Sequence, residues 1–202
     1  MVPDKSELTP EQQDMLRELV NIGIGNATTS LSRMLSNEKV TMEVPEVEVI
    51  PLQEVNEYVE QEKAVAAVFF EAYSDEFSLV LMFVVPVDSA LTLANKVLQV
   101  ESSSMGEMER SALMELGNIV TSSYLNALSD MTGITFQPST PSLAVDMASA
   151  IFGTVMVTTG LVDDHLILCQ TAIETEQDDI SGNIFVFPYQ GLSYMFELMG
   201  VS

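Results

Sequence analysis

The sequence predicts a protein that combines helices and strands, α/β in the broad sense that includes α+β. Two duplicated halves related by a pseudo-twofold axis are expected around a mixed β-sheet. The first observation is a repeat, because residues 14–35 align without a gap with residues 111–132, an offset of 97 (111 minus 14). The second is that paired β-type runs follow each copy. The third is composition: 47% of the 202 residues are apolar and 18% are charged, enough for a buried core. We therefore expect one domain, residues 1–202, with repeats over 9–100 and 104–202.

The first half opens on a helix with explicit start signals. Thr9 can cap its N-terminus, Pro10 suits the first helical position, and Gln12 completes a capping box. This helix is expected to end near residues 35–37. The elements that follow are a strand over 40–51, a hairpin of the runs 64–70 and 77–85, and an amphipathic helix over 87–99.

The second half repeats this order with its own signals. Ser104 and Glu107 have the spacing of a capping box, and Gly133 is a natural end for the helix. The elements that follow are a strand-like stretch over 134–145, a hairpin of the runs 166–173 and 180–187, and an amphipathic segment over 191–200.

Each duplicated helix carries one apolar and one polar stripe, since residues three or four apart are neighbours on a helix. The apolar stripes, expected to be buried, are Leu16, Val20, Ala27, Leu31 and Met34 or Leu35 in the first copy and Leu113, Leu116, Val120, Tyr124, Leu128 in the second. The polar stripes, expected to face solvent, are Asp14, Glu18, Asn21, Gly25 and Ser111, Glu115, Asn118, Ser122.

The repeated Glu–Asn pair has two interpretations. An exposed Glu and Asn are ordinary on a solvated helix face, and duplication can copy a residue without a role. Asn is, however, a poor helix former, because its amide competes for backbone hydrogen bonds. Its occurrence twice, at the same distance from Glu in two duplicated helices, favours a functional site.

The charge balance excludes several classes of function. Thirty Asp and Glu against seven Lys and Arg give a net charge of -23, and the basic residues are scattered singly, which argues against nucleic-acid binding. The longest apolar run, residues 79–87, is far shorter than the ~20 residues of a membrane-spanning helix. Without a recognisable export signal, the protein is expected to be cytoplasmic. The acidic surplus fits either solubility and salt adaptation or electrostatic steering of a partner.

Other chemistry-bearing residues have plain structural interpretations. The single cysteine, Cys169, lies in a β-type run and is expected in the core. Gly23 and Gly25 form a GxGN string inside the helical pattern, which favours a tighter turn or close helix packing over a phosphate loop. No His, Cys or Asp cluster has the pattern of a catalytic triad or zinc site, so no metal of its own is expected.

The spacing of Asp or Ser, Glu, Asn and a later Pro resembles the signature of the CheC/CheX/FliY family of response-regulator phosphatases. The second copy fits the signature fully with Ser111, Glu115, Asn118 and Pro141. The first copy has Asp14, Glu18 and Asn21, with Pro45 one residue late. The likeness runs from about residue 12 to residue 200 and implies the fold of that family.

The resemblance implies a chemistry for each motif residue. The substrate would be the aspartyl phosphate of a CheY-type response regulator, which holds its own Mg²⁺, so this chain would need no cofactor. Asn21 and Asn118 would position the attacking water, because an amide donates and accepts hydrogen bonds without adding negative charge. Glu18 and Glu115 would pair with the lysine of the regulator's active site.

A second partner is implied by residues 141–152, which resemble the helix with which this family docks the deamidase CheD. Asp146 would be its acidic docking residue, with Met147, Ile151 and Phe152 beside it. The alternative function is therefore a non-catalytic adaptor that binds CheD or a response regulator. We expect a monomer that inserts into no membrane and binds no nucleic acid.

Overall fold

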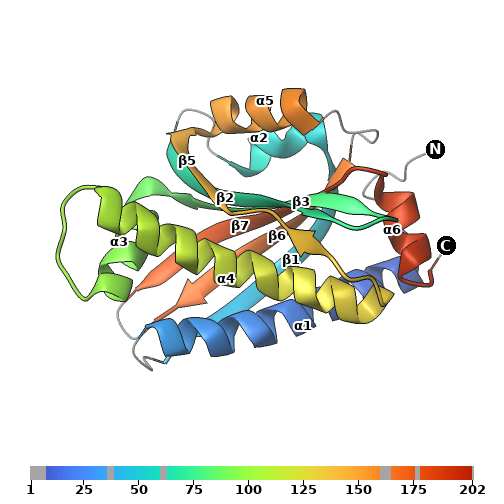
Figure 1. Cartoon of the computed structure of the whole chain (residues 1–202), viewed down its shortest axis with the longest axis horizontal. Helices are drawn as coiled ribbons and strands as arrows, with labels where there is room; N and C mark the ends of the chain where they lie inside the picture. Colours follow the sequence, from blue (N-terminus) through green and yellow to red (C-terminus); the bar gives the residue numbers. More distant parts are fainter. Residues whose placement is uncertain (1–7, 36–38, 60–62, 160–164, 176–177, 202) are drawn as a thin grey trace.

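The computed structural model describes residues 8–35, 39–59, 63–159, 165–175 and 178–201. The predicted elements occur in the predicted order in both halves, with further elements between the first strand and the hairpin of each half (Figure 1). In the first half the elements are α1 Pro10–Met34, β1 Thr41–Pro51, a 3-10 turn Leu52–Glu54, α2 Val55–Tyr58, β2 Ala64–Tyr73, β3 Ser78–Pro86 and α3 Val87–Leu98. In the second half they are α4 Glu107–Thr132, β4 Gln137–Pro138, β5 Ser142–Met147, α5 Ala148–Thr159, β6 His165–Glu174, β7 Asp179–Pro188 and α6 Leu192–Leu198.

The described strands form one sheet in the order β1-β6-β7-β3-β2-β4, with β5 also paired to β2. Every pairing between them is antiparallel, so the prediction of a mixed sheet is wrong on this point. Parallel neighbours need a crossover connection, usually a helix. Here neighbouring strands either belong to one hairpin or come from opposite halves, so no helix joins two neighbours.

The first strand of each half lies beside the hairpin of the other half. β1 pairs with β6, β5 pairs with β2, and the two hairpins meet where β3 pairs with β7. When β1 is equated with β5, β2 with β6 and β3 with β7, the strand order reads the same from both edges. This is the pseudo-twofold arrangement that the repeat predicts, and it interlocks the two halves through backbone hydrogen bonds.

Helices cover both faces of the sheet (Figure 1). α1, α3 and α4 pack on one face, where the buried stripe residues Leu16 and Leu116 join Phe83 in the larger core. α2 and α5 pack on the other face, where Phe152 meets Phe185 edge to face with ring centroids 4.9 Å apart. The predicted apolar stripes of α1 and α4 are buried throughout. Among the described residues, no helix combines the length and apolarity required to cross a bilayer.

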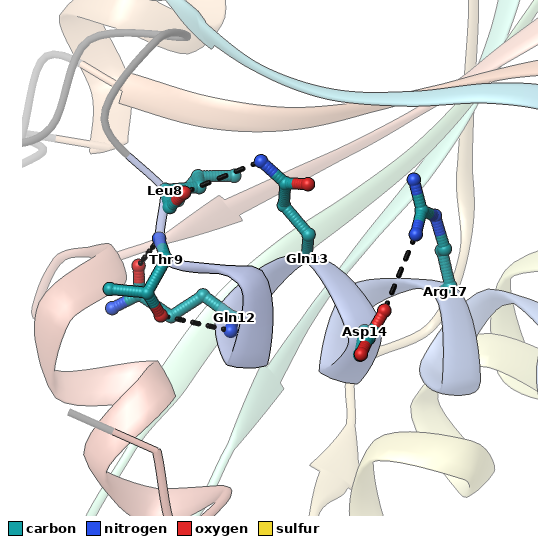
Figure 2. Close-up of polar contacts among 6 residues, drawn as sticks. All are labelled: Leu8, Thr9, Gln12, Gln13, Asp14 and Arg17. Carbon is teal, nitrogen blue, oxygen red and sulfur yellow. Dashed lines mark hydrogen bonds and ion pairs between the residues drawn. The ribbon is translucent and has the colours of Figure 1, made fainter.

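The two long helices begin differently, although their sequences are duplicated. At α1 the predicted capping box is present: Thr9 Oγ1 accepts from the N–H of Gln12 at 3.2 Å, and Gln12 Oε1 accepts from the N–H of Thr9 at 3.0 Å (Figure 2). The predicted box of Ser104 and Glu107 is wrong. α4 starts at Glu107, with Gly106 as its N-cap, so Glu107 stands at the first helical position and not at the third.

Glycine and proline residues set where α4 ends and how the strand region after it divides. α4 stops at Gly133, whose φ of 71° is in the left-handed region, as predicted. The stretch 134–145 is not one strand, because Pro138 and Pro141 lack the N–H group that a continuous ladder needs. It divides into β4 and β5, and β5 begins directly after Pro141.

Candidate functional site

The first polar stripe lies on the outer side of α1. Asp14, Glu18 and Asn21 are exposed, whereas the apolar stripe on the opposite side of the helix is buried against the sheet. The capping box fixes the start of α1 just before this stripe, and Figure 2 shows Asp14 one turn further along. Because the opposite side of α1 is buried, Glu18 and Asn21 face outward. They are three residues apart in the sequence and are therefore neighbours on the helix surface.

Charge at the first motif includes a cation that the sequence analysis did not single out. Arg17 Nη1 lies 3.3 Å from Asp14 Oδ1, one turn along the exposed face (Figure 2). Both side chains are solvent-exposed, so this ion pair contributes at most about 1 kcal/mol to stability. It places a guanidinium next to Glu18 in the sequence. The sequence does carry a signal for this ion pair, because Asp and Arg at positions i and i+3 are neighbours on a helix.

Asn21 borders a groove of about 470 Å³ between α1 and β1. Val44 and Glu46 of β1 line the same groove, on either side of Pro45 in the sequence. The register of β1 against β6 shifts between Glu43 and Glu46, and Pro45 falls within that shift. A proline is tolerated there because the ladder requires no donor at the irregularity. The expected late Pro of the first motif thus lies in a strand that faces the motif helix.

The second polar stripe lies on the outer side of α4. Ser111 and Glu115 are exposed and Asn118 is partly buried. The hydroxyl of Ser122, one turn beyond Asn118, donates to its Oδ1 at 3.2 Å. The sequence placed Ser122 on this stripe but did not predict the bond, whose signal is the (i, i+4) spacing.

Pro141 lies with the second motif, although it is far from it in sequence. Ser111, Glu115 and Pro141 line one shallow cavity of about 480 Å³, together with Met34 and Met108. The spacing of the signature therefore brings three of its four residues in the second copy to one surface.

The two motifs lie at opposite ends of the α1–α4 pair. The helices run antiparallel (Figure 1), and Met34 at the end of α1 lines the cavity beside Ser111 near the start of α4. The helices approach closely where a Cβ on Gly23 would lie 3.0 Å from the Tyr124 ring, as the close-packing interpretation of that glycine predicts. At 1.5 Å per residue, Glu18 and Glu115 are roughly 20 Å apart along the pair. The molecule thus presents two separate Glu–Asn pairs.

The segment expected to dock CheD is a strand followed by a helix. Asp146 and Met147 end β5 and are exposed, and the exposed fraction of Met147 is 50%. Ile151 and Phe152, at the start of α5, are only 5% and 2% exposed. Both pack into the core between α5 and the sheet, whereas Asp146 and Met147 are exposed, and the docking role of the four residues stays a prediction. The spacing of the apolar residues in this segment fits a buried helix face as well as an exposed docking face.

No site for a catalytic metal is evident in the part of the chain that the structure describes. No three His, Cys, Asp or Glu side chains there are grouped so that they could hold an ion. Cys169 is buried within β6, as predicted. What the arrangement offers chemically is an exposed carboxylate beside an amide, presented twice on helices, with the amide exposed at Asn21 and partly buried at Asn118.

The duplicated halves and the repeated Glu–Asn pair define the class of protein. A profile of the CheC-like family matches residues 11–49 and 108–145, and the two segments start 97 residues apart (108 minus 11), the offset of the repeat. The chain belongs to the CheC-like family.

The similar proteins cover between 63% and 96% of the chain. It is 30% identical over 200 residues to the CheY-P phosphatase CheC of Bacillus subtilis, covering 95% of each protein. It is 27% identical over 132 residues to the flagellar motor switch phosphatase FliY of the same organism, covering 63% of this chain and 34% of that protein. The crystal structure of Thermotoga maritima FliY has the same fold, with a TM-score of 0.76, 23% identity and coverage of 96% and 98%. Two of these relatives are thus named as phosphatases, and one of the two as a phosphatase of CheY-P.

Proposed function

We propose that this protein is a chemotaxis phosphatase that hydrolyses the aspartyl phosphate of a CheY-type response regulator. The observation that carries the proposal is the Glu–Asn pair, held outward on α1 and again on α4. An outward-facing Glu–Asn pair on a helix suits a protein substrate whose own active site receives the helix. The name of the Bacillus subtilis relative supplies the substrate class.

The chemistry asks little of the phosphatase beyond positioning. An acyl phosphate is intrinsically reactive, and its hydrolysis needs a water in line with the departing carboxylate oxygen. Asn21 or Asn118, inserted into the regulator's site, orients that water through its amide. The amide brings no negative charge toward the phosphoryl group, which a carboxylate would do.

The glutamates serve the docking step. Glu18 and Glu115 each form a charged hydrogen bond with the regulator's active-site lysine, which fixes the helix over the phosphoryl group. The Mg²⁺ of the reaction belongs to the regulator, and this chain contributes no cofactor. Because the Asn is one turn from the Glu, one docking event places both side chains.

The test is the rate of dephosphorylation of phosphorylated CheY from Bacillus subtilis by the wild type and by Asn21→Ala, Asn118→Ala and the double variant. Each single variant is expected to keep the activity of its intact site, and the double variant to lose about 100-fold or more. Circular dichroism checks that the helices persist. Wild-type activity in the folded double variant would contradict the assignment.

The adaptor alternative has one observation in its favour, the exposed Asp146 and Met147 at the end of β5. A carboxylate beside a half-exposed methionine fits a protein contact, and CheD is the partner that the family likeness implies. Binding of CheD that Asp146→Ala weakens and the double Asn variant leaves intact, without any turnover of phosphorylated CheY, would favour an adaptor over a phosphatase.

A further inference from the structure

Three consecutive hydroxyl residues in α4 use their hydroxyl groups differently. Thr121 and Ser123 each donate to the main-chain carbonyl four residues earlier, both at 2.7 Å. That is the usual bond of a hydroxyl inside a helix. Ser122 instead donates to a side chain, Oδ1 of Asn118, at 3.2 Å. The hydroxyl that lies next to the second motif is therefore engaged with the amide of that motif.

We infer that Ser122 is a positioning residue, which acts through Asn118 by fixing the orientation of its amide. The inference rests on the proposed phosphatase function. The terminal torsion of Asn is soft, so an unrestrained amide exchanges the places of its acceptor and its donors. The bond to Ser122 holds Oδ1 toward the C-terminal end of α4 and thereby sets Nδ2 on the other side. An amide oriented before docking loses less entropy when it orders the attacking water.

The first motif lacks this device. The residue at the position of Ser122 in α1 is Gly25 (122 minus 97), which has no hydroxyl to offer Asn21. A Cβ added at Gly25 meets no atom within 4 Å, so the position accepts a side chain without rearrangement. The two sites therefore differ in how strongly the amide is oriented, and the site on α4 turns over faster.

The loss test measures the second site alone, in the Asn21→Ala background, with phosphorylated CheY from Bacillus subtilis. Removing the bond in Ser122→Ala should lower kcat about 3- to 10-fold, the value of one hydrogen bond, and leave KM unchanged because Glu115 is intact. Ser122→Thr keeps a hydroxyl and should restore most of the rate. A merely structural role for Ser122 would not produce this split between kcat and KM.

The gain test uses the first site alone, in the Asn118→Ala background. Gly25→Ser should raise kcat several-fold, whereas the matched control Gly25→Ala, which lacks the hydroxyl, should not. Equal rates for these two variants, or an unchanged kcat in Ser122→Ala, would overturn the inference. If Asn118→Ala added to Asn21→Ala abolishes activity while Ser122→Ala leaves kcat unchanged, the inference alone fails. If neither Asn118→Ala nor Ser122→Ala lowers the activity in this background, the proposed function fails as well.

Discussion

At the residue scale, burial has its clearest chemical effect at Cys169. The thiol is 1% exposed on the strand face that packs under α4, and burial raises its pKa from the ordinary 9.0 to about 12. Burial also raises the pKa of Tyr124 in the same core, helped by the nearby Cys169. Both groups are therefore neutral in the folded protein at any pH near neutrality, so neither is available as a nucleophile or base.

These shifts make folding stability depend on alkaline pH. Below pH 9 the thiol is protonated in both folded and unfolded chains, so its contribution is constant. Between 9 and about 12 the unfolded thiol ionises while the folded one stays protonated, so the free energy of unfolding falls as pH rises. At pH 10.5 the thiol alone should cost about 2 kcal/mol, at 1.36 kcal/mol per pKa unit.

The measurement is urea unfolding at pH 8 and pH 10.5 for the wild type and for Cys169→Ala. The variant starts from a lower stability because it leaves a cavity, but it should lose about 2 kcal/mol less than the wild type between the two pH values. An equal loss in both proteins would show that Cys169 does not contribute to the pH dependence.

At the element scale, the seating of α4 on the sheet depends on a small residue next to the second motif. A Cβ on Gly117 would lie 2.5 to 2.7 Å from the side chain of Val68 in β2. Because Val68 is itself buried, the helix or the strand must move to accept a methyl group. We expect Gly117→Ala to lower the free energy of unfolding by about 1–3 kcal/mol, although alanine has a better helix propensity than glycine.

The matched control is Gly25→Ala on α1, where the added Cβ meets nothing within 4 Å. It should raise stability by about 0.5–1 kcal/mol through helix propensity alone. Thermal unfolding of the two variants should therefore shift in opposite directions. Stabilisation by Gly117→Ala would mean that α4 does not seat closely on β2.

The same scale shows what the sequence could predict. The hairpins and the two long helices carry local signals, namely apolar runs between polar turns, apolar stripes and the capping box of α1, and these were placed correctly, whereas the box predicted at Ser104 was not. Strand partners carry none, because the pairing of β1 with β6 depends on contacts between halves. Apolar spacing also could not separate an exposed surface from the core, which is why the burial of Ile151 and Phe152 was not predicted. The polar faces of the motifs were predictable since both copies showed them.

At the scale of the whole molecule, the pseudo-twofold fold presents two copies of one motif in different surroundings. The first has an ion pair, Asp14 with Arg17, where the second has Ser111 and Met114. In the second motif the hydroxyl of Ser122 holds the amide of Asn118, whereas the first motif has Gly25 at the position of Ser122, with open space around it. Because the motifs lie at opposite ends of the helix pair, each site can change without altering the other. Duplication thus supplies the geometry, and the proposed difference in rate between the two sites would come from local substitutions.

The net charge of -23 acts on the same scale. Two of the thirty acids, Glu18 and Glu115, are proposed to contact a partner's lysine, and Asp146 is proposed to dock a second protein. The others belong to no identified motif, so we attribute the surplus to solubility or salt adaptation before steering. Steered association falls steeply with ionic strength, since the Debye length shrinks from about 30 Å at 0.01 M salt to about 3 Å at 1 M.

The expected result is therefore a kcat/KM for phosphorylated CheY that is flat or rises across this range of salt. The measurement is the dephosphorylation rate at limiting substrate, with circular dichroism at each salt concentration to follow the fold. Self-repulsion between carboxylates weakens as salt screens it, so stability should rise alongside. A steep fall in kcat/KM with the fold unchanged would instead assign the surplus charge to attracting the regulator.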